Sequence, residues 1–303
     1  MSILVTGCAG FIGSHVCEHL LKSNMNVIGV DNINDYYDQN RKYNNLEILN
    51  KYNNFTFVQN DIVDSKCIDI YKPHKVIHLA GMAGVRYSLE NPTLYCRVNI
   101  EGTVNLLEQS RKNNVKLFLY ASSSSVYGNS KSEFREDNVL DIPESIYALT
   151  KQTVESMATM YNKLYNLNVI GFRFFTVYGP RCRPDMAPFT FIDKISKGET
   201  INKYGDGSSY RDYTHIDDIV QGIMKALDSD YDCQVFNLGN NKTWTLNEFI
   251  EMCEIVTGRK ALINNLPNQM GDVNGTFANI DKSRKLLNYS PSIDPMDGLK
   301  TIN

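Results

Sequence analysis

Short runs of apolar residues recur along the first 175 positions, and longer segments with helical spacing lie between them. The runs are rich in Val, Ile and Phe and cover residues 3–5, 27–30, 55–58, 76–79, 117–120 and 169–172. Continuous apolar runs of this length predict strands that are buried on both faces. Because these strands alternate with helices, we predict an α/β fold in which helices cover both faces of a parallel, doubly wound sheet.

Strand signals become sparser beyond about residue 175. Thr245 and Glu248 have the spacing of a capping box, and the helix that they begin is predicted to end near Gly258. We therefore expect a first domain over residues 1–174 and a smaller C-terminal substrate-binding lobe that makes up most of residues 175–303. Residues 213–227 are predicted to be helical, and the segment of about 210–240 is expected to return to the first domain.

Composition restricts the classes of partner. The 31 basic and 34 acidic residues give a net charge of -3, so no basic surface is expected for nucleic acid or for a membrane. No stretch approaches the roughly 20 apolar residues of a membrane span, and the N-terminus lacks a signal-like segment. Seven cysteines without a Cys-x-x-Cys pair predict reduced thiols and no metal site. We expect a cytoplasmic protein that acts on a small molecule.

A glycine loop follows the first predicted strand. The residues TGCAGFIG at 6–13 place Gly7, Gly10 and Gly13 around Phe11 and Ile12, directly before a predicted helix. Such a turn lets backbone N–H groups approach a pyrophosphate at the helix N-terminus, although three glycines alone are also compatible with a simple tight turn. Asp31 ends the second strand about 20 residues further on, where a carboxylate accepts hydrogen bonds from a ribose and repels a 2′-phosphate. The combination predicts a Rossmann-type domain that binds NAD rather than NADP.

Tyr147 and Lys151 lie four residues apart at the start of a predicted helix, in the sequence YALTK. Residues at this spacing share one face of a helix. A free tyrosine titrates near pH ~10, and a cation about 5 Å from its hydroxyl would lower that pKa by about two units. The positive nicotinamide ring of bound NAD⁺ would lower it further. The pair therefore predicts a general base, although the same spacing also occurs by chance on helices.

These motifs, together with the serine run SSSSVYG at 122–128, resemble those of the extended short-chain dehydrogenase/reductase family. Within that family the chain is most similar to the nucleotide-sugar epimerases, and in particular to the UDP-glucuronate 4-epimerases. The resemblance covers almost the whole chain. Four stretches carry the finer likeness: DNINDYYD at 31–38, AGVRYSLENP at 83–92, RFFTVYGPRCRPDMA at 173–187 and YRDYTHIDDI at 210–219.

The resemblance implies roles for particular side chains. Tyr147 would take the proton from the sugar 4-hydroxyl while C4 passes its hydride to NAD⁺. Lys151 would hold the nicotinamide ribose and tune Tyr147, and Ser123 would bond the 4-oxygen and relay the proton. The resulting 4-keto sugar would turn over in the pocket and take the hydride back on its other face, as in an NAD-dependent isomerase.

The resemblance also implies further binding residues. Adenine, ribose and phosphate contacts of the cofactor fall to Asn32, Asp61, Ile62, Leu79, Ala80, Gly81 and Asn99. Contacts to the UDP-sugar substrate fall to Arg86, Arg211 and Asp272. Simpler interpretations remain for three of them: Asn99 as a helix cap, Arg211 as a surface pair with Asp212, and Asp272 as a turn residue.

The serine run separates reaction classes within the family. Relatives that dehydrate or decarboxylate their sugar carry an acidic residue where Ser124 and Ser125 stand, and a hydroxyl does not remove a carbon-bound proton. With Thr176, these two serines are predicted to hold a sugar carboxylate by hydrogen bonds. The simpler interpretation is that Ser122 and Ser125 only satisfy backbone groups at the end of the strand.

Three functions remain open on the sequence alone. They are a UDP-glucuronate 4-epimerase that forms UDP-galacturonate, an epimerase or dehydratase of another nucleotide sugar such as UDP-glucose, and an NAD-sensing regulator without catalysis. The intact Tyr147 and Lys151 pair disfavours the regulator. The resemblance further implies a homodimer joined by a four-helix bundle that uses the helices after Pro92 and Tyr147.

Overall fold

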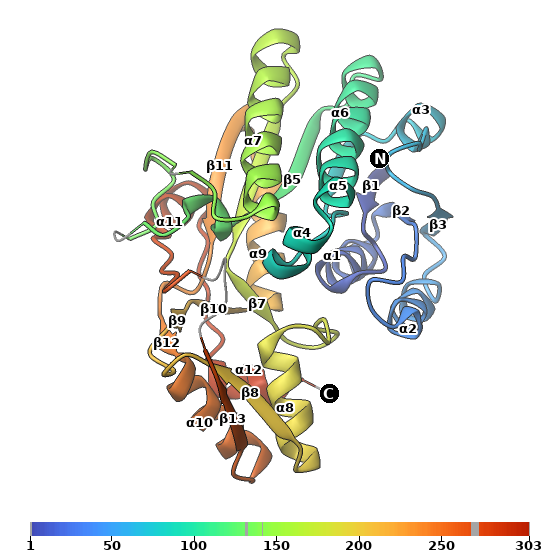
Figure 1. Ribbon diagram of the computed structural model, residues 1–303. Helices are drawn as coiled ribbons and strands as arrows, with labels where there is room; N and C mark the ends of the chain where they lie inside the picture. Colours follow the sequence, from blue (N-terminus) through green and yellow to red (C-terminus); the bar gives the residue numbers. More distant parts are fainter. Residues whose placement is uncertain (1, 131–132, 141, 268–272, 303) are drawn as a thin grey trace.

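A parallel sheet lies at the centre of the protein (Figure 1). The computed structural model describes residues 2–130, 133–140, 142–267 and 273–302. Within these residues the sheet has seven strands, in the spatial order β11 (Cys233–Leu238), β6 (Val169–Phe174), β5 (Leu117–Ser123), β4 (Lys75–His78), β1 (Ser2–Thr6), β2 (Asn26–Asp31) and β3 (Phe55–Gln59). The six predicted strands are confirmed as β1 to β6. The seventh, β11, was not predicted, because Gln234 and Asn237 interrupt its apolar run.

Helices cover both faces of the sheet, as predicted, and each face has its own apolar core. One face packs against α1 (Phe11–Lys22), α2 (Gln39–Leu49), α9 (Ile216–Leu227) and α11 (Asp281–Leu287). The other face packs against α3 (Cys67–Tyr71), α6 (Gly102–Lys112) and α7 (Ile146–Tyr165), and α7 also contacts α4 (Val85–Glu90), α5 (Pro92–Tyr95) and the π-helix η1 (Cys96–Glu101). A short 3₁₀ helix, η2 (Ser124–Tyr127), follows β5.

A third core lies in the C-terminal part of the chain, at the lower end of Figure 1. Its helices are α8 (Ala187–Lys197), α10 (Leu246–Thr257) and α12 (Pro295–Leu299). Short paired strands accompany them: β7 (Thr176–Tyr178) with β10 (Tyr213–His215), β9 (Tyr210–Arg211) with β12 (Trp244–Thr245), and β8 (Thr200–Tyr204) with β13 (Leu262–Leu266). The predicted capping box is confirmed, since Thr245 Oγ1 accepts from the Glu248 N–H at 3.2 Å and α10 ends at Gly258 in the left-handed conformation.

The helix predicted over residues 213–227 is correct only from Ile216 onward. The first three residues form β10, and His215 caps α9 by accepting the Asp217 N–H at its ring nitrogen. Tyr213, Thr214 and His215 pair with β7 instead of continuing the helix. Helix α9 packs against α1, and β11 joins the central sheet beside β6.

The strand order reverses between β1 and β4. From β1 the chain continues outward through β2 to β3, then crosses back to β4 and continues through β5 and β6 to the other edge. Ligands of open parallel sheets bind in the crevice outside the carboxyl ends of the strands at such a reversal. The loops that follow β1 and β4 therefore mark the expected binding site.

Candidate active site

The glycine loop has a conformation that side chains would not allow. Gly7 has a φ of +72°, and a Cβ atom there would lie 2.8 Å from the Ala80 nitrogen in the loop after β4. A Cβ atom on Gly13 would lie 2.0 Å from the Gly7 carbonyl oxygen. Helix α1 begins at Phe11, and its N-cap Gly10 has no side chain to occupy the first N–H groups of the helix. These groups are thus left for an anion such as a pyrophosphate.

Asp31 lies buried at the end of β2, as predicted. Its carboxylate accepts the Ala9 N–H at 3.1 Å and the Ile33 N–H at 2.9 Å. Burial raises the pKa of Asp31, while the positive charge of Lys42 opposes that rise. Asn32 donates to Asp61 Oδ2 at 3.1 Å and so joins the ends of β2 and β3. The carboxylate is therefore fixed beside the glycine loop.

One cavity, which we call the main cavity, runs along the carboxyl ends of the central strands. Its lining includes fifteen of the predicted site residues: Gly7, Gly10, Phe11, Ile12, Gly13, Asp31, Asn32, Asp61, Ile62, Leu79, Ala80, Gly81, Ser123, Tyr147 and Lys151. The buried Lys42, which the sequence analysis missed, also lines it and donates to the Asn34 carbonyl at 2.9 Å. A lysine within a polar stretch gives no sequence signal of burial.

Asn99 holds in place the loop after β4, which borders the main cavity. Its Oδ1 accepts the Met82 N–H at 2.8 Å, and its Nδ2 donates to the Met82 carbonyl and to Thr150 Oγ1, both at 3.0 Å. Asn99 lies within the π-helix η1 rather than at a helix terminus, so its interpretation as a simple helix cap is wrong. It joins the loop after β4 to helix α7.

Tyr147 and Lys151 occupy the first turns of α7 and both face the main cavity. The helix begins after Ser145, whose Oγ accepts the Ala148 N–H at 3.1 Å. The Lys151 ammonium lies 5.9 Å from the centre of the Tyr147 ring and donates to the Ala121 carbonyl at 2.8 Å. Burial lowers the pKa of Lys151 to about 8.

The pKa of Tyr147 differs from the expectation. Burial raises it, and the hydrogen bond with Ser123 and the charge of Arg183 oppose that rise. The predicted lowering by Lys151 is therefore wrong for the protein without a bound cofactor, because the phenol loses more hydration than the neighbouring charges replace. A cationic ring in the main cavity would add to the lowering effects.

Arg183 is a second residue that the sequence analysis did not single out. It lines the main cavity, donates to Asp185 Oδ1 at 2.9 Å and lies over the ring of Tyr36. It belongs to residues 173–187, one of the four stretches that carry the family likeness. The same stretch contains Arg181, which instead bonds Glu18 and His15 on α1, and spacing alone does not separate the two.

A second cavity adjoins the first at the serine run. It is lined by Ser124, Ser125, Thr176 and Arg211, all predicted to meet the substrate, together with residues of the 273–276 segment and the start of α7. The Ser123 hydroxyl donates to Ser125 Oγ at 3.1 Å, which links the two cavities through neighbouring side chains. Ser122 does not bond a backbone group: its hydroxyl donates to Glu155, an acid that the sequence analysis had not connected with the serines.

Arg211 and Asp212 do not pair with each other. Arg211 donates to the carbonyls of Val273 and Tyr210, both at 2.9 Å. The buried Asp212 carboxylate accepts the N–H groups of residues 240 and 241 instead. The interpretation of Arg211 as half of a surface ion pair is therefore wrong.

One predicted substrate residue, Arg86, is not brought into these cavities. Arg86 is exposed on α4, where its guanidinium lies 4.7 Å from the centre of the Tyr204 ring. It contributes to the lining of neither cavity. Asp272 lies outside the described residues.

The described residues carry neither a candidate metal site nor a candidate membrane span. In that part of the chain, no group of three or more His, Cys, Asp or Glu is placed to hold a metal ion. Within the same ranges, no helix combines the length and apolarity needed to cross a bilayer.

Comparison with known proteins gives the same family as the motifs. Over 306 residues the chain is 45% identical to a UDP-glucuronate 4-epimerase of Thermodesulfobacterium geofontis, covering 99% of this chain and 94% of that protein. Its structure is similar to that of UDP-glucuronic acid 4-epimerase from Bacillus cereus in complex with UDP-glucuronic acid and NAD, with a TM-score of 0.96, 36% identity and coverage of 100% and 98%. It is also similar to a UDP-glucose 4-epimerase from Thermotoga maritima with UDP-glucose, with a TM-score of 0.92, 31% identity and coverage of 100% and 97%.

The match to the sequence pattern of a protein family covers most of the chain. The sequence pattern of the "NAD dependent epimerase/dehydratase family" matches residues 3–239, which include the glycine loop, the serine run and the Tyr147 and Lys151 pair. The chain belongs to the NAD dependent epimerase/dehydratase family.

Proposed function

We propose that the protein is an NAD-dependent epimerase that inverts C4 of UDP-glucuronate to form UDP-galacturonate. The observation that carries the proposal is the hydrogen bond from Ser123, which lines the main cavity, to Ser125, which lines the second cavity. One cavity has the glycine loop and the Tyr147 phenol, and the other has hydroxyls and an arginine. The arrangement suits a substrate whose sugar lies at the junction and whose two charged groups lie in the second cavity.

The main cavity suits NAD. The glycine loop leaves room for a pyrophosphate that a Cβ atom would exclude, and Asp31 offers two carboxylate oxygens to a ribose. Asn32, Asp61 and Ile62 would surround the adenine, and the loop after β4 would pass along the second ribose. When bound, NAD supplies a group that accepts a hydride from C4 and returns it.

Side chains of the protein would transfer the proton of the C4 hydroxyl. Tyr147 would take the proton of the C4 hydroxyl and give it back after the sugar has turned over. Ser123 bonds the Tyr147 hydroxyl and would hold the oxygen on C4. Lys151, fixed on the Ala121 carbonyl, would bind the nicotinamide ribose and favour the phenolate by its charge.

The second cavity would hold the remainder of the substrate. Arg211, whose planar guanidinium is anchored on two backbone carbonyls, would bond the diphosphate. Ser124, Ser125 and Thr176 would donate hydrogen bonds to the sugar carboxylate. Hydroxyl groups stabilise that carboxylate without a further charge beside C5.

The proposed reaction is tested by adding UDP-glucuronate to the purified protein without added cofactor and following the 4-epimer by NMR. We expect UDP-galacturonate to accumulate until the two sugars reach equilibrium, because the hydride returns to the same substrate and no net redox change occurs. UDP-glucose, tested in parallel, should react far more slowly. Turnover of UDP-glucose with inert UDP-glucuronate would assign the protein to the neutral sugar instead.

Replacing both Ser124 and Ser125 with alanine should raise KM for UDP-glucuronate by about tenfold or more. Each lost hydrogen bond to a charged group costs about 1.5 kcal/mol or more. For UDP-glucose, KM should change by less than about threefold, because the carboxylate is absent. Steady-state kinetics with both sugars measure the ratio, and Ser196→Ala, on the exposed side of α8, is the control. Equal changes for both sugars would contradict the carboxylate site.

We also propose that the protein is a cytoplasmic homodimer. The faces of α5, α6 and α7, which lie side by side in Figure 1, carry exposed apolar side chains that a four-helix bundle would cover. They are Leu94, Val104, Leu149, Met160 and Leu164. Light scattering would give twice the 34.5 kDa mass of one chain.

We also propose a division into a cofactor domain over residues 1–174 and a mainly substrate-binding remainder. The packing of α9 against α1 and the place of β11 in the central sheet support the return of the later segment to the first domain.

A further inference from the structure

A row of polar side chains crosses the carboxyl ends of three neighbouring strands. Ser122 of β5 lies opposite Arg173 of β6, and Arg173 lies opposite Asn237 of β11. Directly opposed residues of parallel strands point to the same side of the sheet. All three are buried, with exposed fractions of 2%, 4% and 0%. Buried polar groups need partners, so something on this side of the sheet must satisfy them.

Glu155 of α7 is the partner of the first two. The Ser122 hydroxyl donates to Glu155 Oε1. Arg173 donates to the same carboxylate through two nitrogens, Nε to Oε1 at 2.9 Å and Nη2 to Oε2 at 2.7 Å. Its guanidinium also lies 4.7 Å from the centre of the Tyr127 ring. A buried, bidentate ion pair of this kind fixes the position of helix α7 relative to strand β6.

The same helix carries the proton-transfer residues. Tyr147, Lys151 and Glu155 follow one another at intervals of four and share one face of α7. Lys151 donates to the carbonyl of Ala121, and Glu155 bonds the next residue of the strand, Ser122. Helix α7 therefore holds β5 at two successive residues, immediately before Ser123. The charge of Glu155 also raises the pKa of Lys151, against the effect of burial.

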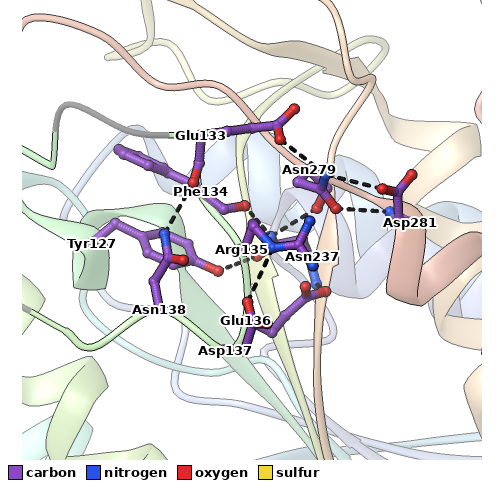
Figure 2. Close-up of polar contacts among 10 residues, drawn as sticks. All are labelled: Tyr127, Glu133, Phe134, Arg135, Glu136, Asp137, Asn138, Asn237, Asn279 and Asp281. Carbon is purple, nitrogen blue, oxygen red and sulfur yellow. Dashed lines mark hydrogen bonds and ion pairs between the residues drawn. The ribbon is translucent and has the colours of Figure 1, made fainter.

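The other end of the row is anchored to a loop (Figure 2). The Tyr127 hydroxyl donates to Asn237 Oδ1 at 2.7 Å. Asn237 Nδ2 in turn donates to the carbonyl of Phe134 at 2.7 Å and to that of Asn279 at 2.9 Å. Phe134 belongs to the connection between η2 and α7. The polar row thus ties the connection that precedes Tyr147 to the strands that end beneath it.

We propose that Glu155 is a positioning residue of the epimerase reaction: held by Ser122 and Arg173, it keeps the Lys151 ammonium and the Ser123 end of β5 in place against Tyr147. Glu155 does not touch the substrate or the cofactor in this arrangement. It acts through Lys151 and through the strand. The inference rests on the proposed function, because it assigns Lys151 and Ser123 their roles in that reaction.

Few groups near Lys151 and Glu155 titrate between pH 6 and 10. His78 faces Lys151 from β4 and stays neutral, because burial lowers its pKa to about 3. Tyr120 faces Glu155 from β5 and stays protonated, because burial raises its pKa well above the usual value. The other charged or titratable groups include Tyr147, Lys151 and Glu155 on α7, Arg173 on β6, and Arg183, which faces Tyr147. Tyr127, Glu136 and Lys282 act on Arg173.

The first measurement is the pKa of Lys151 itself, which needs no turnover. Competitive labelling with traces of acetic anhydride across a pH series, read by mass spectrometry of the peptide that contains Lys151, gives this pKa in the intact protein. In the unmodified protein we expect about 8. Glu155→Gln removes a charge that favours the ammonium, so the pKa should fall by about one unit. In Glu155→Gln/Arg173→Met it should fall by about half as much, because an opposing charge is removed too.

The second measurement is the dependence of kcat on pH. An ammonium that loses its proton at a lower pH should move the alkaline limb of the profile to lower pH by the same amount and lower kcat at pH 8 by about fivefold. Glu155→Asp keeps the charge and should restore most of the pH profile. Glu254→Gln on α10, which breaks a surface pair with Lys260, should change neither quantity.

Three results would overturn the inference. The first is a folded variant with lower thermal stability but an unchanged Lys151 pKa and pH profile, which indicates a purely structural pair. The second is a Glu155→Asp variant as impaired as Glu155→Gln. The third is that neither charge-removing variant folds, which makes the pair a requirement for folding. Loss of the proposed function gives a different pattern, since the unmodified protein would then fail to epimerise UDP-glucuronate while the labelling shift remained.

Discussion

Replacing Tyr147 with phenylalanine is expected to lower kcat for UDP-glucuronate by about 10³-fold and to leave the cofactor bound. Loss of a positioned general base costs about 10²- to 10⁴-fold. Tyr147 is the phenol that shares a hydrogen bond with Ser123. The substitution removes one hydroxyl and keeps the ring, so KM should change by less than about threefold. Initial rates by NMR and the NAD released on denaturation measure the two effects.

A matched control for this variant lies on the same helix. Tyr161→Phe removes the hydroxyl that donates to Glu108 at 3.3 Å, more than three helical turns from Tyr147. It should keep kcat within about twofold of the unmodified protein. A Tyr147→Phe variant that retains more than about a tenth of the original kcat would remove Tyr147 from its assigned role.

Replacing Gly13 with alanine is expected to yield protein without NAD and with a Tm lower by about 5 °C or more. The added methyl group would lie 2.0 Å from the Gly7 carbonyl oxygen and 2.7 Å from the Gly7 carbonyl carbon. Both are backbone atoms of the loop that would cradle the pyrophosphate, so the loop itself must move. Overpacking of this kind costs about 1 to 3 kcal/mol or more. Calorimetry gives Tm, and absorbance of the denatured supernatant gives the NAD content.

Gly10→Ala separates the cofactor effect from the folding effect. A methyl group at Gly10 meets only the Gly7 oxygen, at 3.2 Å, so Tm should stay within about 2 °C of the original value. The methyl group would still point to the N-terminus of α1 and should weaken NAD binding. Normal NAD content in purified Gly13→Ala would mean that the glycine loop is not the cofactor site.

Features that depend on neighbours in the sequence could be predicted. The six strands β1 to β6, the glycine loop with Asp31 and the face shared by Tyr147 and Lys151 all follow from local spacing. The parallel arrangement then places the loops after β1 and β4 together. For this reason most of the predicted cofactor residues line one cavity in the structure.

Features that depend on strand register could not be predicted. Arg173 meets Glu155 because β5, β6 and α7 place them together, although 18 residues separate them in the chain. Arg183 enters the main cavity while Arg181, two residues earlier, turns to α1. The polar positions in β11 likewise make sense only beside Arg173 and the Tyr127 hydroxyl. The pKa of Tyr147 was misjudged because the cost of burial depends on everything packed around the ring.

The serine hydroxyls at the junction of the two cavities bear on the direction of the reaction. A hydroxyl rotates about its C–O bond and both donates and accepts, so Ser123 and Ser125 accommodate an oxygen above or below the sugar plane with little penalty. We therefore expect neither epimer to be retained in preference to the other. Forward and reverse conversions should then proceed at comparable speed, and the final ratio of the two sugars should reflect their relative stability in water.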